Sequence, residues 1–237
     1  MSVLEARAPF VADPARPPGP PKLSPAELAR AQRETLAVPR LRRDPFTTVL
    51  VAMVDLVYGR RGSLGKFKVL ELLAPLPYQA WERAAYRALT RLHSHTTVAR
   101  RVFDAMVEAR AQQDNEAFHL LVLEELLQDQ GAKQGFLRYR LLPRLMAAPY
   151  RLLCWALFLV RPAWSYRLNA SFEDHAEHAY MSFVAAHPEL EAEPFRSEAA
   201  SDYGRYESVA DVLRQIGHDE RIHKLESLSA QHRPQLS

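Results

Sequence analysis

Two Glu-x-x-His steps occur in this sequence, each with a histidine three residues after a glutamate, and both lie in stretches with helical periodicity. They are Glu116 with His119, and Glu220 with His223. Residues three apart on a helix are neighbours on one face, so each step directs a carboxylate and an imidazole toward one partner. Ile216 precedes Glu220 on its face at helical spacing, so the second step is predicted to point into a core.

Two further glutamates interrupt apolar faces. Glu71 lies within the run VLELL, and Glu173 shares a helical face with Ala176 and Tyr180. An ionised carboxylate in an apolar interior is strongly disfavoured unless it is paired or bound to a cation, and four of them together repel one another. We therefore expect metal ions among these acids. One glutamate from each of two helices, plus Glu-x-x-His from each of two others, is the ligand set of dinuclear sites in ferritin-like bundles.

The ligand types also restrict the metal. Four carboxylates offset the charge of two divalent ions, and the imidazoles favour iron or manganese over calcium, which prefers a shell of oxygen atoms. Cys154 is the single cysteine, which excludes an internal disulfide, a zinc ribbon and a thiolate iron–sulfur cluster.

An alternative interpretation is that these pairs are solvated groups on helix surfaces, since Glu-x-x-His pairs also arise by chance in a chain with nine histidines. The order of the four acids, each on its own amphipathic helix, favours the metal site. Other acids are interpreted as surface or outer groups, namely Glu82, Glu124 and Glu125. His175 and His178 stand three residues apart beside Glu173 and could also bind metal, but they lie off the inward-facing line of their helix, which favours other roles for them.

The composition predicts a globular, mainly helical protein. Of 237 residues, 48% are hydrophobic and 25% are charged, and eight Gly against seventeen Pro leave few turn residues for short strands. Lysine and arginine exceed the acids by only 31 to 28, which indicates mild attraction to anionic surfaces. The longest apolar stretch, 141–164, is interrupted by prolines and arginines and is too broken to span a bilayer. Early acids argue against a secretory signal and disfavour a transit peptide.

The elements that would position these ligands follow from the periodicity, which predicts an all-α fold. Residues 1–43 are expected to be a Pro-rich arm, mobile over 1–22, with one short helix that a capping box begins. Residues 44–228 are expected to form the helical bundle domain, and 229–237 a C-terminal tail. The predicted helices cover 25–36, 46–58, 64–93 with a break at Pro75 and Pro77, 97–129, 135–160, 163–187 and 208–229. A loop is predicted over 187–206, followed by a cap at Ser208 and Asp211.

Four sequence blocks resemble the alternative oxidase family, most closely its plastid terminal oxidase branch. The blocks are VLELLAPLPY from Val69, NEAFHLLVLEEL from Asn115, FEDHAEHAYMSF from Phe172 and DVLRQIGHDERIH from Asp211. They occur in the order typical of the family, and each contains an acid already identified on physical grounds. The resemblance covers about residues 46–228. It implies a ferritin-like four-helix bundle that holds two iron ions, with additional interfacial membrane-binding helices, in a homodimer.

The resemblance also implies roles for individual residues. The iron ligands would be Glu71, Glu116, His119, Glu173, Glu220 and His223. Asn115 and Asp219 would orient those ligands, and Tyr180 would be the catalytic tyrosine near the iron pair, with core packing as the alternative. The quinol pocket would be lined by Lys66, Leu70, Phe172, His175 and Ala176. The chain departs from the family in several respects. Lys66 and Gly217 stand at positions where the family usually has arginine, and the longer plastid insertion after Tyr180 is missing.

The implied reaction oxidises two quinols, plastoquinol or ubiquinol, and reduces dioxygen to two waters without pumping protons. Because quinols stay in lipid, the protein is expected to bind one leaflet of a thylakoid or bacterial inner membrane as a monotopic protein. The segment 141–164 is expected to enter the leaflet, with helix 46–58 beside it; core or dimer packing is the alternative. The expected leaflet residues are Leu142, Leu145, Met146, Leu152, Leu153, Leu157 and Phe158. Nearby arginines would meet lipid phosphates, and no nucleic acid is expected as a partner.

Three other functions stay open from the sequence. The first is a di-iron hydroxylase that acts on a quinone precursor or a lipid. The second is a ferritin-like bundle that binds and oxidises iron without quinol. The third is a purely structural helical bundle, which would leave the buried acids unexplained.

Overall fold

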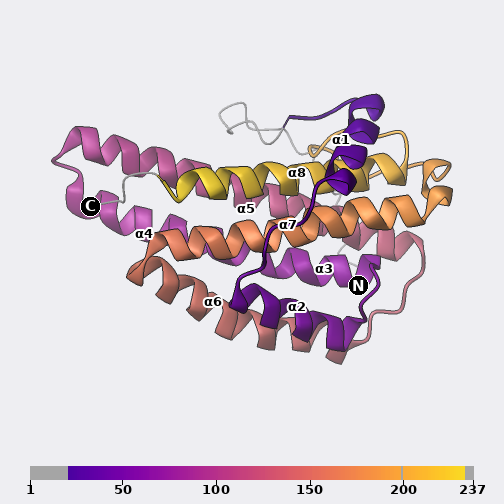
Figure 1. Ribbon diagram of the computed structural model, residues 1–237, viewed down its shortest axis with the longest axis horizontal. Helices are drawn as coiled ribbons and strands as arrows, with labels where there is room; N and C mark the ends of the chain where they lie inside the picture. Colours follow the sequence, from indigo (N-terminus) through magenta and orange to yellow (C-terminus); the bar gives the residue numbers. More distant parts are fainter. Residues whose placement is uncertain (1–20, 199, 233–237) are drawn as a thin grey trace, which may run out of the picture.

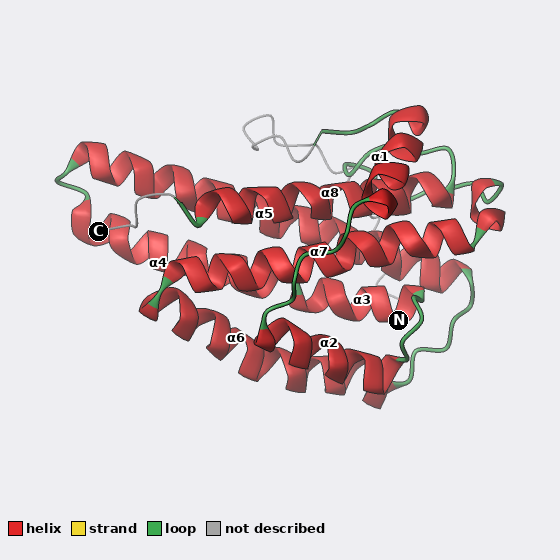
Figure 2. Ribbon diagram, viewed as in Figure 1, coloured by secondary structure: helices red, strands yellow, loops and turns green. Residues whose placement is uncertain are grey.

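The computed structural model describes residues 21–198 and 200–232, and over these residues the protein is helical with no strand (Figure 2). The helices are α1 (Pro25–Ala37), α2 (Pro45–Tyr58), α3 (Leu64–Leu73), α4 (Pro75–Leu92), α5 (Thr96–Asp129), α6 (Leu142–Val160), α7 (Pro162–Ala186) and α8 (Val209–Ala230). A π-helical turn, Leu137–Leu141, leads into α6, and a 3-10 turn, Pro188–Glu191, follows α7. The predicted all-α class is confirmed.

The centre of the molecule is a bundle of four long helical rods that lie side by side (Figure 1). One rod is α3 followed by α4, and the others are α5, α7 and α8. α7 packs along α8, while α3 and α4 both pack on α5. Large side chains fill the space between the rods, among them Phe67, Leu123, Tyr180 and Leu213, which are fully buried. The predicted ferritin-like bundle is therefore present.

The breaks and starts of these helices follow local chemistry. α3 ends at Leu73 and α4 begins at Pro75, because proline lacks the backbone N–H that would continue the helix. At the start of α1, the Glu27 carboxylate accepts a hydrogen bond from the Ser24 backbone N–H at 2.9 Å. At the start of α8, the Ser208 hydroxyl accepts from the Asp211 N–H at 3.1 Å. The predicted break and both predicted caps are confirmed.

Helices α2 and α6 lie on one side of the bundle, along the lower edge of Figure 1. α6 packs against α4 and α7 through its inner face. Leu157 and Phe158 belong to that inner face, with exposed fractions of 9% and 6%, so their prediction as leaflet residues is wrong. The sequence assigned the whole segment to the leaflet, but a helix turns 100° per residue and buries one side. Over the described residues, we find no helix that is both long and apolar enough to cross a membrane.

Helix α1 lies across α7 and α8 (Figure 1). Its Gln32 amide donates to the Met181 carbonyl at 2.9 Å, and Arg221 of α8 donates to the Ala31 carbonyl at 2.8 Å. Residues 1–20 of the predicted mobile arm lie outside the described residues. Lys22 is described, however, and it contacts Asp219 of α8, so the prediction that the mobile arm extends through residue 22 is wrong.

Candidate metal centre

The six predicted ligands meet in the middle of the bundle. They are Glu71 from α3, Glu116 and His119 from α5, Glu173 from α7, and Glu220 and His223 from α8. All six are at least 99% buried. They form two overlapping groups of four, and within each group the candidate ligand atoms lie within 4.8 Å of one another. The first group holds Glu71 and His119, and the second holds Glu173 and His223.

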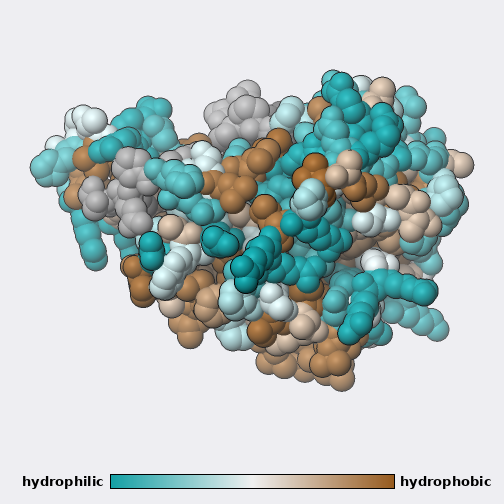
Figure 3. All heavy atoms as spheres, viewed as in Figure 1, coloured by the Kyte–Doolittle hydropathy of each residue, from teal (hydrophilic) through white to brown (hydrophobic). Residues whose placement is uncertain are grey.

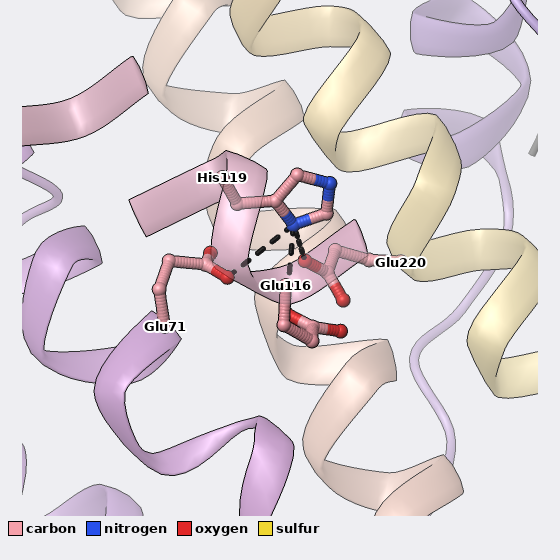
Figure 4. A group of neighbouring side chains, drawn as sticks. All are labelled: Glu71, Glu116, His119 and Glu220. Carbon is pink, nitrogen blue, oxygen red and sulfur yellow. Dashed lines mark ion pairs between the residues drawn. The ribbon is translucent and has the colours of Figure 1, made fainter. Parts of the chain in front are cut away.

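Glu116 and Glu220 belong to both groups, and each divides its two oxygens between the two histidines. The Nδ1 atom of His119 is 3.5 Å from Oε2 of Glu116 and 3.1 Å from Oε1 of Glu220. The Nδ1 atom of His223 is 2.7 Å from Oε1 of Glu116 and 3.7 Å from Oε2 of Glu220. Figure 4 shows the first group, in which the Glu71 carboxylate also faces the His119 ring at 3.3 Å. Each of these two carboxylates could therefore supply one oxygen to each of two metal positions.

The unpaired atoms of the site test whether metal fits. Both oxygens of Glu116 and Glu220 and the Nδ1 atoms of both histidines are buried and, in the described structure, face only one another, without a hydrogen-bond partner outside the cluster. The Oε2 atoms of Glu71 and Glu173 are in the same condition. Buried polar atoms that lack partners are costly and rare. A divalent ion about 2.1 Å from its ligands holds neighbouring ligand atoms about 3 to 3.5 Å apart, close to the separations of 2.7 to 3.7 Å above. The residues therefore fit two metal ions.

Tyrosines orient the two carboxylates that belong to one group only. The Tyr180 hydroxyl donates to Oε1 of Glu71, and the Tyr78 hydroxyl donates to Oε1 of Glu173 at 2.7 Å. Asn169 supports Tyr78 by donating to its hydroxyl at 2.8 Å. In each carboxylate one oxygen is thus engaged, and the other stays free for a metal. The sequence identified Tyr180 but missed the contact of Tyr78, because Tyr78 and Glu173 are 95 residues apart.

Asp219 orients one of the two histidines. Its Oδ2 atom lies 3.3 Å from Nε2 of His119, and the Asn115 amide donates to the same oxygen at 3.2 Å. A neutral imidazole that binds metal through Nδ1 carries its proton on Nε2, so His119 donates to Asp219. The Nε2 atom of His223, by contrast, is buried and has no hydrogen-bond partner among the described residues. The sequence predicted Asn115 and Asp219 as outer residues; Asp219 contacts the candidate ligand His119, and Asn115 contacts Asp219.

Burial and mutual repulsion control ionisation in this site. Burial raises the pKa of Glu71 and Glu173 well above the ordinary value, and the neighbouring carboxylates of Glu220 and Glu116 raise it further. Burial also opposes charge on the two imidazoles, but the facing carboxylates outweigh it, which raises the pKa of His223 to about 10 and that of His119 well above its usual range. For Glu116 the histidines outweigh burial and lower the pKa. Without metal, protons therefore hold these groups together.

The metal-free protein is expected to lose stability as the pH rises from about 6 to 9. Groups with a raised folded-state pKa, here Glu71, Glu173 and both histidines, bind more protons folded than unfolded between their unfolded and folded pKa values, and for His223 that interval runs from 6.5 to about 10. Each excess proton costs about 1.4 kcal/mol of stability per pH unit. Urea unfolding of chelator-treated protein at several pH values measures this slope. A Glu71→Gln, Glu173→Gln variant should flatten it, and an unchanged slope in that variant would contradict the assignment.

A third cluster, Asp174, Glu177 and His178 on α7, also brings candidate ligand atoms together. Lys224 and Arg221 of α8 neutralise it, since Lys224 Nζ is 3.1 Å from Asp174 and Arg221 Nε is 3.0 Å from Glu177. This cluster is therefore an ion-pair network between helices. His178 lies in this cluster and outside the two central groups.

The residues of the predicted quinol pocket lie on α3 and α7. Leu70, Phe172 and Ala176 are buried apolar side chains. Lys66 is 3% exposed and pairs with Asp55 of α2. His175 is 7% exposed, and Arg43 contacts its Nδ1 atom at 3.0 Å.

The acids predicted as surface or outer groups contact basic side chains or a hydroxyl away from the central cluster. Glu82 accepts from Arg110 at 2.7 Å, Glu124 pairs with Lys68, and Glu125 accepts from the Ser197 hydroxyl. None of them belongs to the two overlapping ligand groups. The predicted separation of these acids from the central six is confirmed.

Comparison with known proteins gives one family. The family model described as alternative oxidase matches residues 39–230, a range that contains all six candidate ligands, both tyrosines that contact them and Asp219. A search of curated proteins gave no match. The match identifies the family as a whole and does not separate its plastid branch.

Proposed function

The chain belongs to the alternative oxidase family, and from this we propose that it is a quinol oxidase that reduces dioxygen to water at a site for two iron ions. The observation that carries the proposal is the pair of overlapping ligand groups, whose buried carboxylate oxygens and imidazole nitrogens lack other partners. Four carboxylates match the charge of two divalent ions, and a mixed nitrogen and oxygen donor set suits iron. The proposed ligands are Glu71, Glu116, His119, Glu173, Glu220 and His223.

Bound iron would supply the change of valence that dioxygen reduction requires. The chain contributes a water-poor interior and ligands that are held before metal binds. Glu116 and Glu220 offer oxygens to both metal positions, and Glu71 and Glu173 offer one each. Tyr180 is fully buried, stacks on Phe67 at 4.3 Å between ring centroids, and holds its hydroxyl proton against Glu71. We assign Tyr180 the role of giving one electron toward the reduction of dioxygen while its proton moves to that carboxylate, after which quinol returns an electron and a proton to the tyrosine.

The overall reaction balances as two quinols and one dioxygen giving two quinones and two waters. The test is oxygen uptake by the purified protein with short-chain plastoquinol and ubiquinol analogues, together with iron content. Quinol-dependent uptake with about two irons per chain and no oxygenated product would support the proposal. An oxygenated product would instead indicate a hydroxylase, and iron oxidation without any dependence on quinol would indicate an iron-binding bundle. The ratio of the two quinol rates would identify the preferred substrate.

We propose that quinol binds beside α3 and α7, at Lys66, Leu70, Phe172, His175 and Ala176. Support comes from His175, whose Nε2 atom is buried without a hydrogen-bond partner in the described part of the chain. Since Arg43 donates to Nδ1, the Nε2 atom carries the proton and is available to a quinol oxygen. Burial, with Arg43 next, lowers the pKa of His175 to about 3, so the ring is neutral.

Replacing His175 by leucine is expected to raise the KM for quinol about tenfold, the cost of one hydrogen bond of about 1.4 kcal/mol. Iron content should stay unchanged, because His175 is outside both ligand groups. Steady-state kinetics over a range of quinol concentrations, alongside iron analysis, measures both quantities. An unaltered KM would place the quinol elsewhere.

The proposed membrane surface is formed by exposed apolar stripes on α2 and α6, on the lower edge of the molecule where hydrophobic side chains gather (Figure 3). On α2 the stripe is Phe46, Val49, Met53 and Leu56; on α6 it is Leu145, Leu152, Leu159 and Val160. Leu56 and Val160 are the most exposed, at 87% and 75%. Exposed arginines such as Arg144, Arg151 and Arg161 flank the α6 stripe. Apolar stripes with flanking cations are typical of helices that lie in one leaflet.

A Leu152→Glu, Leu159→Glu variant is expected to bind membranes about a hundredfold more weakly, or worse. Each substitution removes the favourable free energy of burying one leucine side chain in the lipid, about 1.5 to 3 kcal/mol. Flotation with anionic phospholipid vesicles measures the partition. The matched control is Leu225→Glu on α8, because Leu225 is 52% exposed and lies outside both stripes. Equal partition of the double variant and the wild type would reject this surface.

The homodimer stays a prediction, which light scattering of the detergent-solubilised protein would test.

A further inference from the structure

Asp219 is the point where several hydrogen bonds meet behind the metal ligands. It is fully buried, and its Oδ2 atom faces His119 and Asn115, as described above. The same oxygen accepts from the Tyr203 hydroxyl at 2.7 Å, while Oδ1 accepts from the Gln215 amide at 2.6 Å. These donors are neutral when His119 binds metal through Nδ1. They satisfy the carboxylate's hydrogen bonds but leave its negative charge uncompensated.

Lys22 supplies the missing charge. Its Nζ atom lies 3.3 Å from Oδ2 of Asp219, and no other lysine or arginine contacts this carboxylate in the described part of the chain. The ammonium also lies 3.6 Å from the centroid of the Tyr203 ring, which is a favourable cation–π position. The Lys22 side chain is 36% exposed, so the cation reaches this buried group from the surface. A buried charge whose partner is removed is strongly destabilised.

The backbone on both sides of Lys22 is fixed by one residue of α8. The Leu23 N–H donates to the Gln215 side-chain oxygen at 3.0 Å, and the Gln215 amide donates to the Pro21 carbonyl at 3.1 Å. Ser24 then begins α1, which is itself bound to α7 and α8. Residues 21–24 therefore form a strap, which we call the N-terminal strap, with Lys22 directed inward at its centre.

We propose that Lys22 is a positioning residue for the metal site, and that the N-terminal strap holds its ammonium against Asp219, which in turn holds the His119 ring with Nδ1 facing Glu71, Glu116 and Glu220. This inference rests on the proposed metal site. Lys22 lies outside the range that the family model matches, and no ligand atom comes from it. Its effect on metal binding is indirect, through the hydrogen bond between Asp219 and His119.

The test is metal affinity, measured with Fe²⁺ alone under anaerobic conditions in competition with a chelator. Lys22→Met is expected to weaken binding of one of the two ions about threefold to tenfold, somewhat less than the loss that follows removal of a group bonded to a ligand directly, because Lys22 acts through Asp219. Lys22→Arg should restore most of the affinity, because it keeps the cation. The matched control is Lys224→Met, which removes a lysine from the ion pair with Asp174 without touching Asp219. Thermal unfolding in the presence of chelator shows whether each variant is folded. If Lys22→Met does not fold, Lys22→Gln takes its place in the experiment.

A double-mutant cycle with Asp219→Asn separates positioning from general stability. If Lys22 acts through Asp219, Lys22→Met should change affinity little in the Asp219→Asn background. Full additivity, a loss no larger than that of Lys224→Met, or affinity within about twofold of the wild type would each overturn the inference. Failure of the proposed function gives a different result, because the wild-type protein itself would then bind no pair of iron ions.

Discussion

Replacing Glu220 by alanine is expected to remove both iron ions and reduce oxygen uptake by at least about a thousandfold. Glu220 is a member of both ligand groups, with Oε1 toward His119 and Oε2 toward His223. A metal centre supplies several kcal/mol of transition-state stabilisation, and about 4 kcal/mol corresponds to a thousandfold in rate. Glu173→Ala also stops uptake, but it should retain about one iron, because Glu173 belongs to one group only.

Iron per chain, measured by mass spectrometry after desalting, distinguishes the two variants. Glu82→Ala is the control, since this glutamate pairs with Arg110 at the surface of α4 and should leave both ions in place. If Glu220→Ala kept one ion and Glu173→Ala lost two, the assignment of shared and single ligands would be reversed. If neither variant lost iron, the central cluster would not be the metal site.

Replacing Tyr180 by phenylalanine is expected to preserve the iron and lower turnover by about a hundredfold or more. The ring, its stacking on Phe67 and its burial stay, while the hydroxyl that donates to Glu71 is lost. Loss of a group that transfers a proton in the transition state typically lowers the rate by about 10² to 10⁴, which corresponds to an increase of about 3 to 5 kcal/mol in the activation free energy. Oxygen uptake with saturating quinol, together with iron content, measures the two effects separately.

Tyr78→Phe is the matched control for that experiment. Tyr78 makes the equivalent hydrogen bond to Glu173, the carboxylate of the second group. If the loss in Tyr180→Phe came only from a missing hydrogen bond to a ligand, both variants would lose similar activity. A much larger loss at Tyr180 would support its electron-donating role, and full activity of Tyr180→Phe would exclude that role.

Much of the fold and the convergence of the six candidate ligands could be predicted from the sequence, because both depend on local periodicity. An acid on an apolar helix face is visible within one turn, and this local signal is sufficient to locate Glu71, Glu116, Glu173 and Glu220. The break between α3 and α4 is equally local, since it follows from Pro75.

Contacts between distant segments could not be predicted in the same way. Lys22 and Asp219 are 197 residues apart in the sequence, and nothing in the composition of the strap distinguishes Lys22 from a solvated lysine. The buried face of α6 could not be predicted for a related reason. Both sides of that helix are apolar, so periodicity alone did not show that Phe158 packs against Trp81, with 6.4 Å between ring centroids, while Leu152 faces outward.

The different surroundings of the two imidazoles have a consequence for how the centre fills. The Nε2 atom of His119 contacts the Asp219 carboxylate, which orients the ring. The Nε2 atom of His223 has no hydrogen-bond partner in the described structure. A ligand that is already oriented loses less entropy on binding metal, and a carboxylate behind it makes it more basic. The position nearest His119 should therefore load first, and the second ion should enter a pocket whose shared carboxylates the first has already fixed.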